Sequence, residues 1–164
     1  MKLEEVDSSP MVNNTLYRKL IGCLLYLTYT RPDICYTVSV AYIFMDQPQE
    51  IHWKAATRIL NFVQGTRTHG IFYKAKSDLD LIGFTNSDWA GDSTDINSTS
   101  GYVFMLVEGP ISWSSKKQSA IALSSTEAEY RGVVNAATQC LWLQALLGEC
   151  GFEPKYSNTI YYDN

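Results

Sequence analysis

Hydrophobic side chains recur at helical spacing through the first third of the chain. After a polar lead-in over residues 1–14, apolar positions three or four residues apart mark residues 15–28, and a second such stretch runs over residues 32–47. A third covers residues 49–64 and stops at Gly65, a residue typical of helix ends. The pattern predicts three helices, for which a helical packing module is the plain interpretation.

In the rest of the chain, apolar residues alternate with polar ones, which is typical of strands. Two capping-box pairs predict the start of a long helix near residue 125: Ser124 with Glu127, and Thr126 with Glu129. Strands are expected at residues 71–74, 79–88, 101–107, 111–115 and 158–163, with a turn at 108–110 and a short extension at 119–123.

The order of these elements predicts the fold class. Three strands, a helix and a further strand indicate an α/β mixed sheet, because a helix that links two strands of one sheet makes them parallel. The first strands form an antiparallel meander. A polar junction at residues 78–80 separates this sheet from the helical module, so we expect domains at residues 1–76 and 79–164.

Charge and cysteine content narrow the function classes. The net charge of −4 argues against strong autonomous binding of nucleic acid, which usually needs a basic surface. Cys23, Cys35, Cys140 and Cys150 have no metal-binding spacing and indicate a reduced chain. The N-terminus lacks the apolar core of a signal peptide. We therefore expect an intracellular protein, cytoplasmic or nuclear, with no membrane partner.

Acidic residues occur at the strand ends and the helix start, where sites of α/β sheets collect. Asp88 ends the first long strand, Glu127 and Glu129 lie in the first turns of the helix, and Asp163 ends the last strand. Converging carboxylates of this kind bind pairs of Mg²⁺ ions that hydrolyse phosphodiesters. The alternative is structural: Asp88 in a solvated loop, the two glutamates as helix caps, and Asp163 as a terminal residue.

Several stretches, in this order, resemble the Pol polyprotein of plant copia-type retrotransposons. The first group is similar to the end of the family's reverse transcriptase, and the second to the front of its ribonuclease H domain. The first group comprises residues 17–22, 24–28, 30–34, 58–60 and 65–66. The second comprises residues 87–92 (SDWAGD), 98–104 (STSGYVF), 111–118 (ISWSSKKQ), 122–130 (ALSSTEAEY) and 162–164 (YDN).

The resemblance implies a helical reverse-transcriptase tail over residues 1–76 and a truncated ribonuclease H-like sheet over residues 79–164. The family's ribonuclease H cuts the RNA strand of RNA–DNA hybrids with four acidic positions and two Mg²⁺ ions. The first position corresponds to Asn86, the second to Glu129, with Glu127 as the alternative, and the third to Asp163. The fourth is expected downstream of residue 164. The implied partners are an RNA–DNA hybrid and the remainder of the polyprotein.

Two departures from the family pattern predict a degenerate nuclease. Asn86 brings no charge to the site, and Asp88, on the same strand face but about 6–7 Å further along, is a poor substitute. The fourth acidic position, which is expected downstream of residue 164, is also missing, and this likewise predicts weaker catalysis. Two alternatives stay open: an active ribonuclease H within a longer product, and a co-opted, non-enzymatic binding or secreted effector-like protein. Residues 18–21, Arg-Lys-Leu-Ile, only half resemble the Arg-X-Leu-Arg motif of such effectors.

Overall fold

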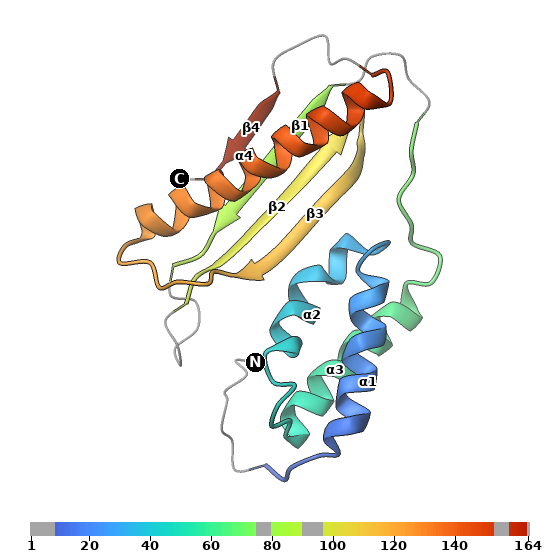
Figure 1. Ribbon diagram of the computed structural model, residues 1–164. Helices are drawn as coiled ribbons and strands as arrows, with labels where there is room; N and C mark the ends of the chain where they lie inside the picture. Colours follow the sequence, from blue (N-terminus) through green and yellow to red (C-terminus); the bar gives the residue numbers. More distant parts are fainter. Residues whose placement is uncertain (1–8, 75–79, 90–96, 153–157, 164) are drawn as a thin grey trace. The chain divides into compact units, whose positions relative to one another are not determined.

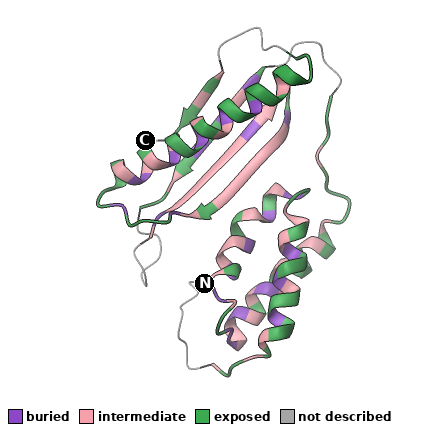
Figure 2. Ribbon diagram, viewed as in Figure 1, coloured by how far each residue is buried: buried purple, intermediate pink, exposed green. Residues whose placement is uncertain are grey.

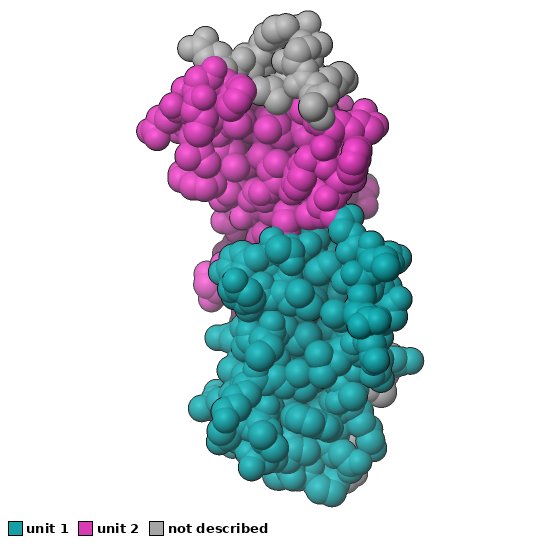
Figure 3. All heavy atoms as spheres, turned by 90° about the vertical axis from the view of Figure 1, so that its right-hand side faces the viewer, with its two compact units in different colours: residues 1–70 teal, residues 71–164 magenta. Residues whose placement is uncertain are grey.

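The chain forms two compact units, Met1–Gly70 and Ile71–Asn164 (Figures 1 and 3). They are seen in a computed structural model that describes residues 9–74, 80–89, 97–152 and 158–163. The predicted polar junction lies largely outside the described residues. Each unit has its own hydrophobic core.

The first unit is helical, as its periodicity predicts. It contains α1 (Asn14–Leu27), η1 (Pro32–Ile34), α2 (Cys35–Tyr42) and α3 (Glu50–Gly65). The second predicted helix is shorter than expected, because the chain after Tyr42 continues through successive i→i+3 bonds, including Phe44 N–H to the carbonyl of Ala41. The core is formed by Tyr17, Ile21, Leu24, Ile34, Val38, Ala41 and Ala56.

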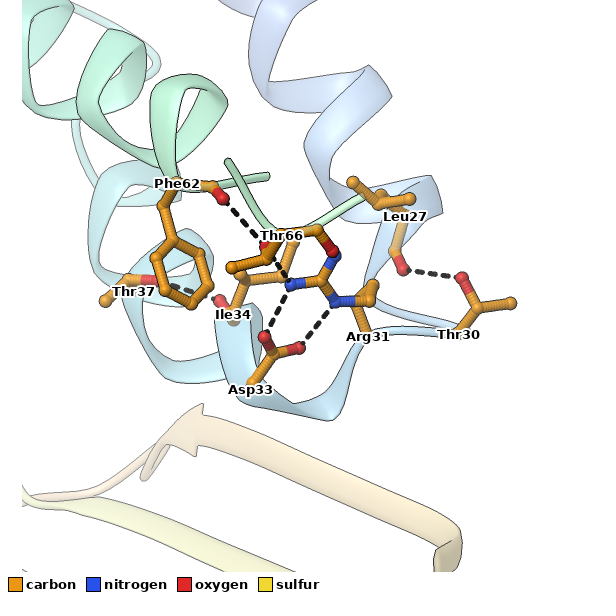
Figure 4. Close-up of polar contacts among 8 residues, drawn as sticks. All are labelled: Leu27, Thr30, Arg31, Asp33, Ile34, Thr37, Phe62 and Thr66. Carbon is orange, nitrogen blue, oxygen red and sulfur yellow. Dashed lines mark hydrogen bonds and ion pairs between the residues drawn. The ribbon is translucent and has the colours of Figure 1, made fainter. Parts of the chain in front are cut away.

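A buried arginine ties the end of α1 to the end of α3 (Figure 4). Arg31 is 8% exposed, and its guanidinium donates to both carboxylate oxygens of Asp33, at 2.9 and 2.7 Å. It also donates to the Thr66 hydroxyl at 2.7 Å and to the Thr66 carbonyl at 3.3 Å. The hydrogen bonds from Arg31 hold the pKa of Asp33 below its usual range. We call Arg31, Asp33 and Thr66 the arginine clasp.

The second unit is a mixed α/β layer, as predicted. Its strands are β1 (Leu81–Ser87), β2 (Thr99–Leu106), β3 (Gly109–Lys117) and β4 (Thr159–Tyr162), in the sheet order β3-β2-β1-β4. The first three form an antiparallel meander, and β4 runs parallel to β1. The crossover between β3 and β4 contains α4 (Ser125–Glu149), which lies across one face of the sheet (Figure 1).

The sheet and α4 meet through small residues. Buried positions of α4 recur every three or four residues, and this stripe faces the sheet (Figure 2). Gly83 lets the Phe104 ring lie against the backbone of β1, since a Cβ there would be 2.6 Å from the ring. The buried stripe of α4 comprises Ala128, Gly132, Ala136, Cys140 and Leu143. No helix in the described part of the chain is long and apolar enough to cross a membrane.

Three local predictions are wrong. Residues 71–74 form no strand, because Tyr73 instead packs on Gly109 and donates a hydrogen bond to the Pro110 carbonyl. The turn before β3 is made by residues 107–108, where Val107 takes a φ of 64°, and β3 already includes Gly109 and Pro110. Residues 119–123 do not extend the sheet.

Candidate functional site

Two of the predicted site residues lie side by side at the ends of neighbouring strands. The last pair of the parallel β1–β4 ladder joins Thr85 to Tyr162, so Asn86 is the next residue of β1 and Asp163 directly follows β4. Both are exposed. Strand alternation directs both side chains to the face on which Phe84 and Tyr161 stack, with ring centroids 5.4 Å apart. This face is opposite the one that carries α4, because the alternate residue Ser87 lies under Gly132.

Glu127 serves as a cap of α4. Its carboxylate accepts the Leu123 N–H at 2.8 Å and a hydrogen bond from the Arg131 guanidinium at 2.7 Å. The Ser124 hydroxyl in turn accepts the Glu127 N–H at 3.2 Å, as the capping-box prediction requires. The Leu123 N–H, followed by Arg131, lowers the pKa of Glu127. Both oxygens are engaged in starting the helix, which favours Glu129 for a functional role.

Glu129 is half-buried, three residues before Gly132 on α4. It lies eleven positions before Cys140, about three helical turns, so the two side chains share one stripe of the helix. Cys140 interacts with the side chain of Asn158, just before β4, whereas its neighbour Gln139 donates to Ser112 on β3. Glu129 therefore approaches the end of β1 from the helix-covered face and can meet the strand-end side chains only around that end.

Asp88 is held at the start of β2. Its carboxylate accepts the backbone N–H of Thr99, and its own N–H donates to the Thr99 carbonyl at 3.1 Å. Since β2 and β4 flank β1 on opposite sides, these bonds draw Asp88 away from Asp163. Asp88 thus stabilises the fold by joining the end of β1 to the start of β2.

The candidate site consists of Asn86, which is neutral, and the carboxylates of Glu129 and Asp163. These two carboxylates lie toward opposite faces of the sheet near the end of β1. Among the described residues, no three His, Cys, Asp or Glu side chains gather closely enough to hold a metal ion. Trp89 is 52% exposed beside this end of the sheet and donates its indole N–H to the Ala122 carbonyl at 3.1 Å. Trp113, on β3, is half-buried.

A polar cluster that the sequence analysis missed lies between β1, β2 and the start of α4. The hydroxyls of Ser87 and Ser100 are 2.8 Å apart, and the Gln118 amide donates to Ser100 at 2.6 Å and to the Ala128 carbonyl at 2.9 Å. Gly132 completes it, because a Cβ there would collide with the Ser87 hydroxyl. The only sequence signal was a glycine inside a helical pattern. We call these five residues the serine–glutamine cluster.

Comparison with known proteins gives the chain its family. It is 45% identical to the retrovirus-related Pol polyprotein from transposon RE1 of Arabidopsis thaliana and 43% identical to that from transposon RE2 of the same plant, in both cases over 99% of the chain. The chain belongs to the copia-type retrotransposon Pol polyproteins. It spans 11% of the length of each of these two relatives. No family model matches the chain.

A shorter relative matches the copia-type chain over nearly its own full length. The secreted RxLR effector protein 161 of Plasmopara viticola is 41% identical over 133 residues, which cover 80% of the chain and 94% of that protein. Copia-type sequence of this extent therefore also occurs outside long polyproteins.

Proposed function

We propose that Ile71–Asn164 is the ribonuclease H-like part of a copia-type Pol polyprotein, and that in this form it hydrolyses RNA in RNA–DNA hybrids poorly. The helical unit before it is proposed as the end of the reverse transcriptase. One observation carries the proposal: a neutral residue, Asn86, sits beside Asp163 at the ends of two parallel strands joined by the α4 crossover. The family's first acidic position corresponds to Asn86.

The donor set of the described residues does not fit two divalent cations. Mg²⁺ prefers carboxylate oxygens, and a pair of dications needs several negative charges nearby to offset their repulsion. Glu129 and Asp163 supply two charges, while Asn86 offers one neutral oxygen. The Asp88 carboxylate is hydrogen-bonded to β2. The net charge of −4 also opposes binding of the negatively charged phosphate backbone.

The test is Mg²⁺-dependent cleavage of an end-labelled RNA–DNA hybrid. We expect the unmodified chain to cut little, since even an outer group around a metal is worth about 10–100-fold in affinity or activity. Asn86→Asp alone should recover little activity. Asn86→Asp with a family-type C-terminal extension should recover measurable cutting that Glu129→Gln abolishes. Asn135→Asp, which adds the same charge at an exposed position of α4, is the matched control.

The result that refutes the degenerate assignment is cleavage by the unmodified chain that Glu129→Gln removes. In that case Asp88 becomes the replacement ligand, and Asp88→Asn should also remove activity. Cleavage that survives Glu129→Gln would instead indicate a contaminating nuclease.

A non-enzymatic role is the second candidate, because the effector protein matches the chain over 94% of its own length. The half-motif at residues 18–21 gives it no support. Arg18 pairs with Asp46 at 2.9 Å, and Ile21 is fully buried in the helical core, so these side chains serve the fold. A secretion reporter fused to the chain distinguishes the candidates: export of the reporter would favour the effector role, and its retention would count against that role.

A further inference from the structure

We infer that Gln118 is a positioning residue that sets where the first turns of α4, and therefore Glu129, lie against the end of β1. The effect on metal binding rests on the proposed function, whereas the placement of α4 rests on the serine–glutamine cluster alone. Gln118 is 9% exposed and follows β3 directly. Its backbone N–H donates to the Ser98 carbonyl at 2.8 Å, which fixes it beside the start of β2.

The Gln118 amide joins the sheet to the helix with both of its hydrogens. One goes to the Ser100 hydroxyl on β2 and the other to the Ala128 carbonyl in the first turn of α4, at 2.6 and 2.9 Å. The reverse amide orientation would point oxygen at the Ala128 carbonyl, so the hydrogen-bond pattern fixes the orientation. The Gln118 side-chain oxygen has no hydrogen-bond partner among the described residues, so the side chain contributes through the two hydrogen bonds that it donates.

The cluster holds α4 on both sides of Glu129. Ala128, one residue before it, is held by Gln118, and Gly132, almost one turn after it, rests on the Ser87 hydroxyl. Ser87 is the residue after Asn86 and is itself linked to Ser100. The helix can neither shift along its axis nor rotate without breaking one of these contacts. The position of Glu129 along and around the helix therefore follows from the contacts of Ala128 and Gly132.

A second glutamine provides a matched control. Gln139 joins α4 to β3 through its amide and the Ser112 hydroxyl, at 3.2 Å, about three turns beyond Glu129. Gln118→Leu and Gln139→Leu each remove a glutamine amide that links the sheet to α4. A general loss of helix docking would follow from both substitutions, whereas a positioning effect on Glu129 would follow from Gln118→Leu alone.

The experiment measures Mn²⁺ affinity of the full chain by paramagnetic resonance in an Asn86→Asp background, alongside amide hydrogen exchange of residues 129–132. We expect Gln118→Leu to lower the Mn²⁺ affinity about 10–100-fold and Gln139→Leu to change it little. We expect faster exchange at residues 129–132 in Gln118→Leu only. Equal losses of affinity in the two variants, or unchanged exchange in Gln118→Leu, would overturn the positioning role.

The two proposals fail separately. If Asn86→Asp binds no Mn²⁺ while Gln118 is intact, the metal-site part of the proposed function is wrong. The exchange measurement then decides the positioning role by itself. Gln118→Glu adds a check on mechanism. An ionised carboxylate facing the Ala128 carbonyl should speed exchange relative to the unsubstituted chain at the same pH, and its protonation, which restores one donor, should shrink that difference. A difference in exchange rate between Gln118→Glu and the unsubstituted chain that stays the same at every pH would contradict the inference.

Discussion

Gly132→Ala tests how closely α4 rests on the sheet. A Cβ at this position would lie 3.4 Å from the Ser87 Cβ and 3.5 Å from the Ser100 hydroxyl, both tolerable, but it would collide with the Ser87 hydroxyl. Relief requires that hydroxyl to turn away and lose its bond to Ser100, which costs about 1 kcal/mol, or requires α4 to move, with overpacking costs of about 1–3 kcal/mol.

Helix propensity acts in the opposite direction. Alanine is better than glycine in a helix interior by about 1 kcal/mol, so the net expectation is a loss of about 0–2 kcal/mol of unfolding free energy. Urea unfolding of the full chain, followed by the near-ultraviolet signal of the second unit, measures it. In a unit of this size each kcal/mol shifts the melting temperature by about 4–8 °C.

Two further variants make the result decisive. Gly148→Ala changes the same helix where a Cβ would meet nothing within 4 Å, so it should be neutral or stabilising. Ser87→Ala removes the colliding oxygen and should make Gly132→Ala stabilising when the two are combined. If Gly132→Ala alone stabilises the chain as Gly148→Ala does, then α4 does not rest on Ser87, and the serine–glutamine cluster does not set the position of Glu129.

Two other predictions concern stability and association. Because the Arg31 hydrogen bonds lower the folded-state pKa of Asp33, its stabilising contribution is full above the ordinary carboxyl pKa of about 3.9 and is lost as pH falls through the lower folded value. Thermal unfolding from pH 7 to pH 2 should therefore show a shallower acid dependence in Asp33→Asn, and an identical slope would contradict the role of the arginine clasp. The strand β4 is an edge of the described sheet, so the chain should self-associate at high concentration. Thr159→Lys should reduce that association in light scattering, and a monodisperse unsubstituted chain would refute the expectation.

The sequence predicted the elements that carry strong local signals. Helical periodicity located α1 and α3 to within about two residues, and the capping box located the start of α4 because Ser124 and Glu127 bond locally. The parallel placement of β4 followed from the order of elements. These features depend on residues close in sequence or on a general rule of chain connection.

Features that depend on distant partners were not predictable. Gly109 and Pro110 looked like a turn, but Gly109 is needed because the Tyr73 ring packs on it, 2.6 Å from where a Cβ would be. Val107 takes the positive φ instead, which is unusual for a β-branched residue. Nothing in the sequence around Gln118 indicates that its side chain bonds to Ser100 and Ala128. The tie between Asp88 and Thr99 likewise became visible only with the register of β1 and β2.

The pairing of β1 with β4 determines when the second unit can fold during synthesis. Ile82 pairs with Thr159, 77 positions later, and those intervening residues form nearly all of the unit. At about 5–20 residues per second, a ribosome needs about 4–15 s to supply the partner strand. The arginine clasp spans only residues 31–66, so the helical unit can fold before the residues of β4 have been synthesised. During that interval β1 has β2 on one side and an exposed backbone on the other, and a nascent chain is most prone to wrong pairing there.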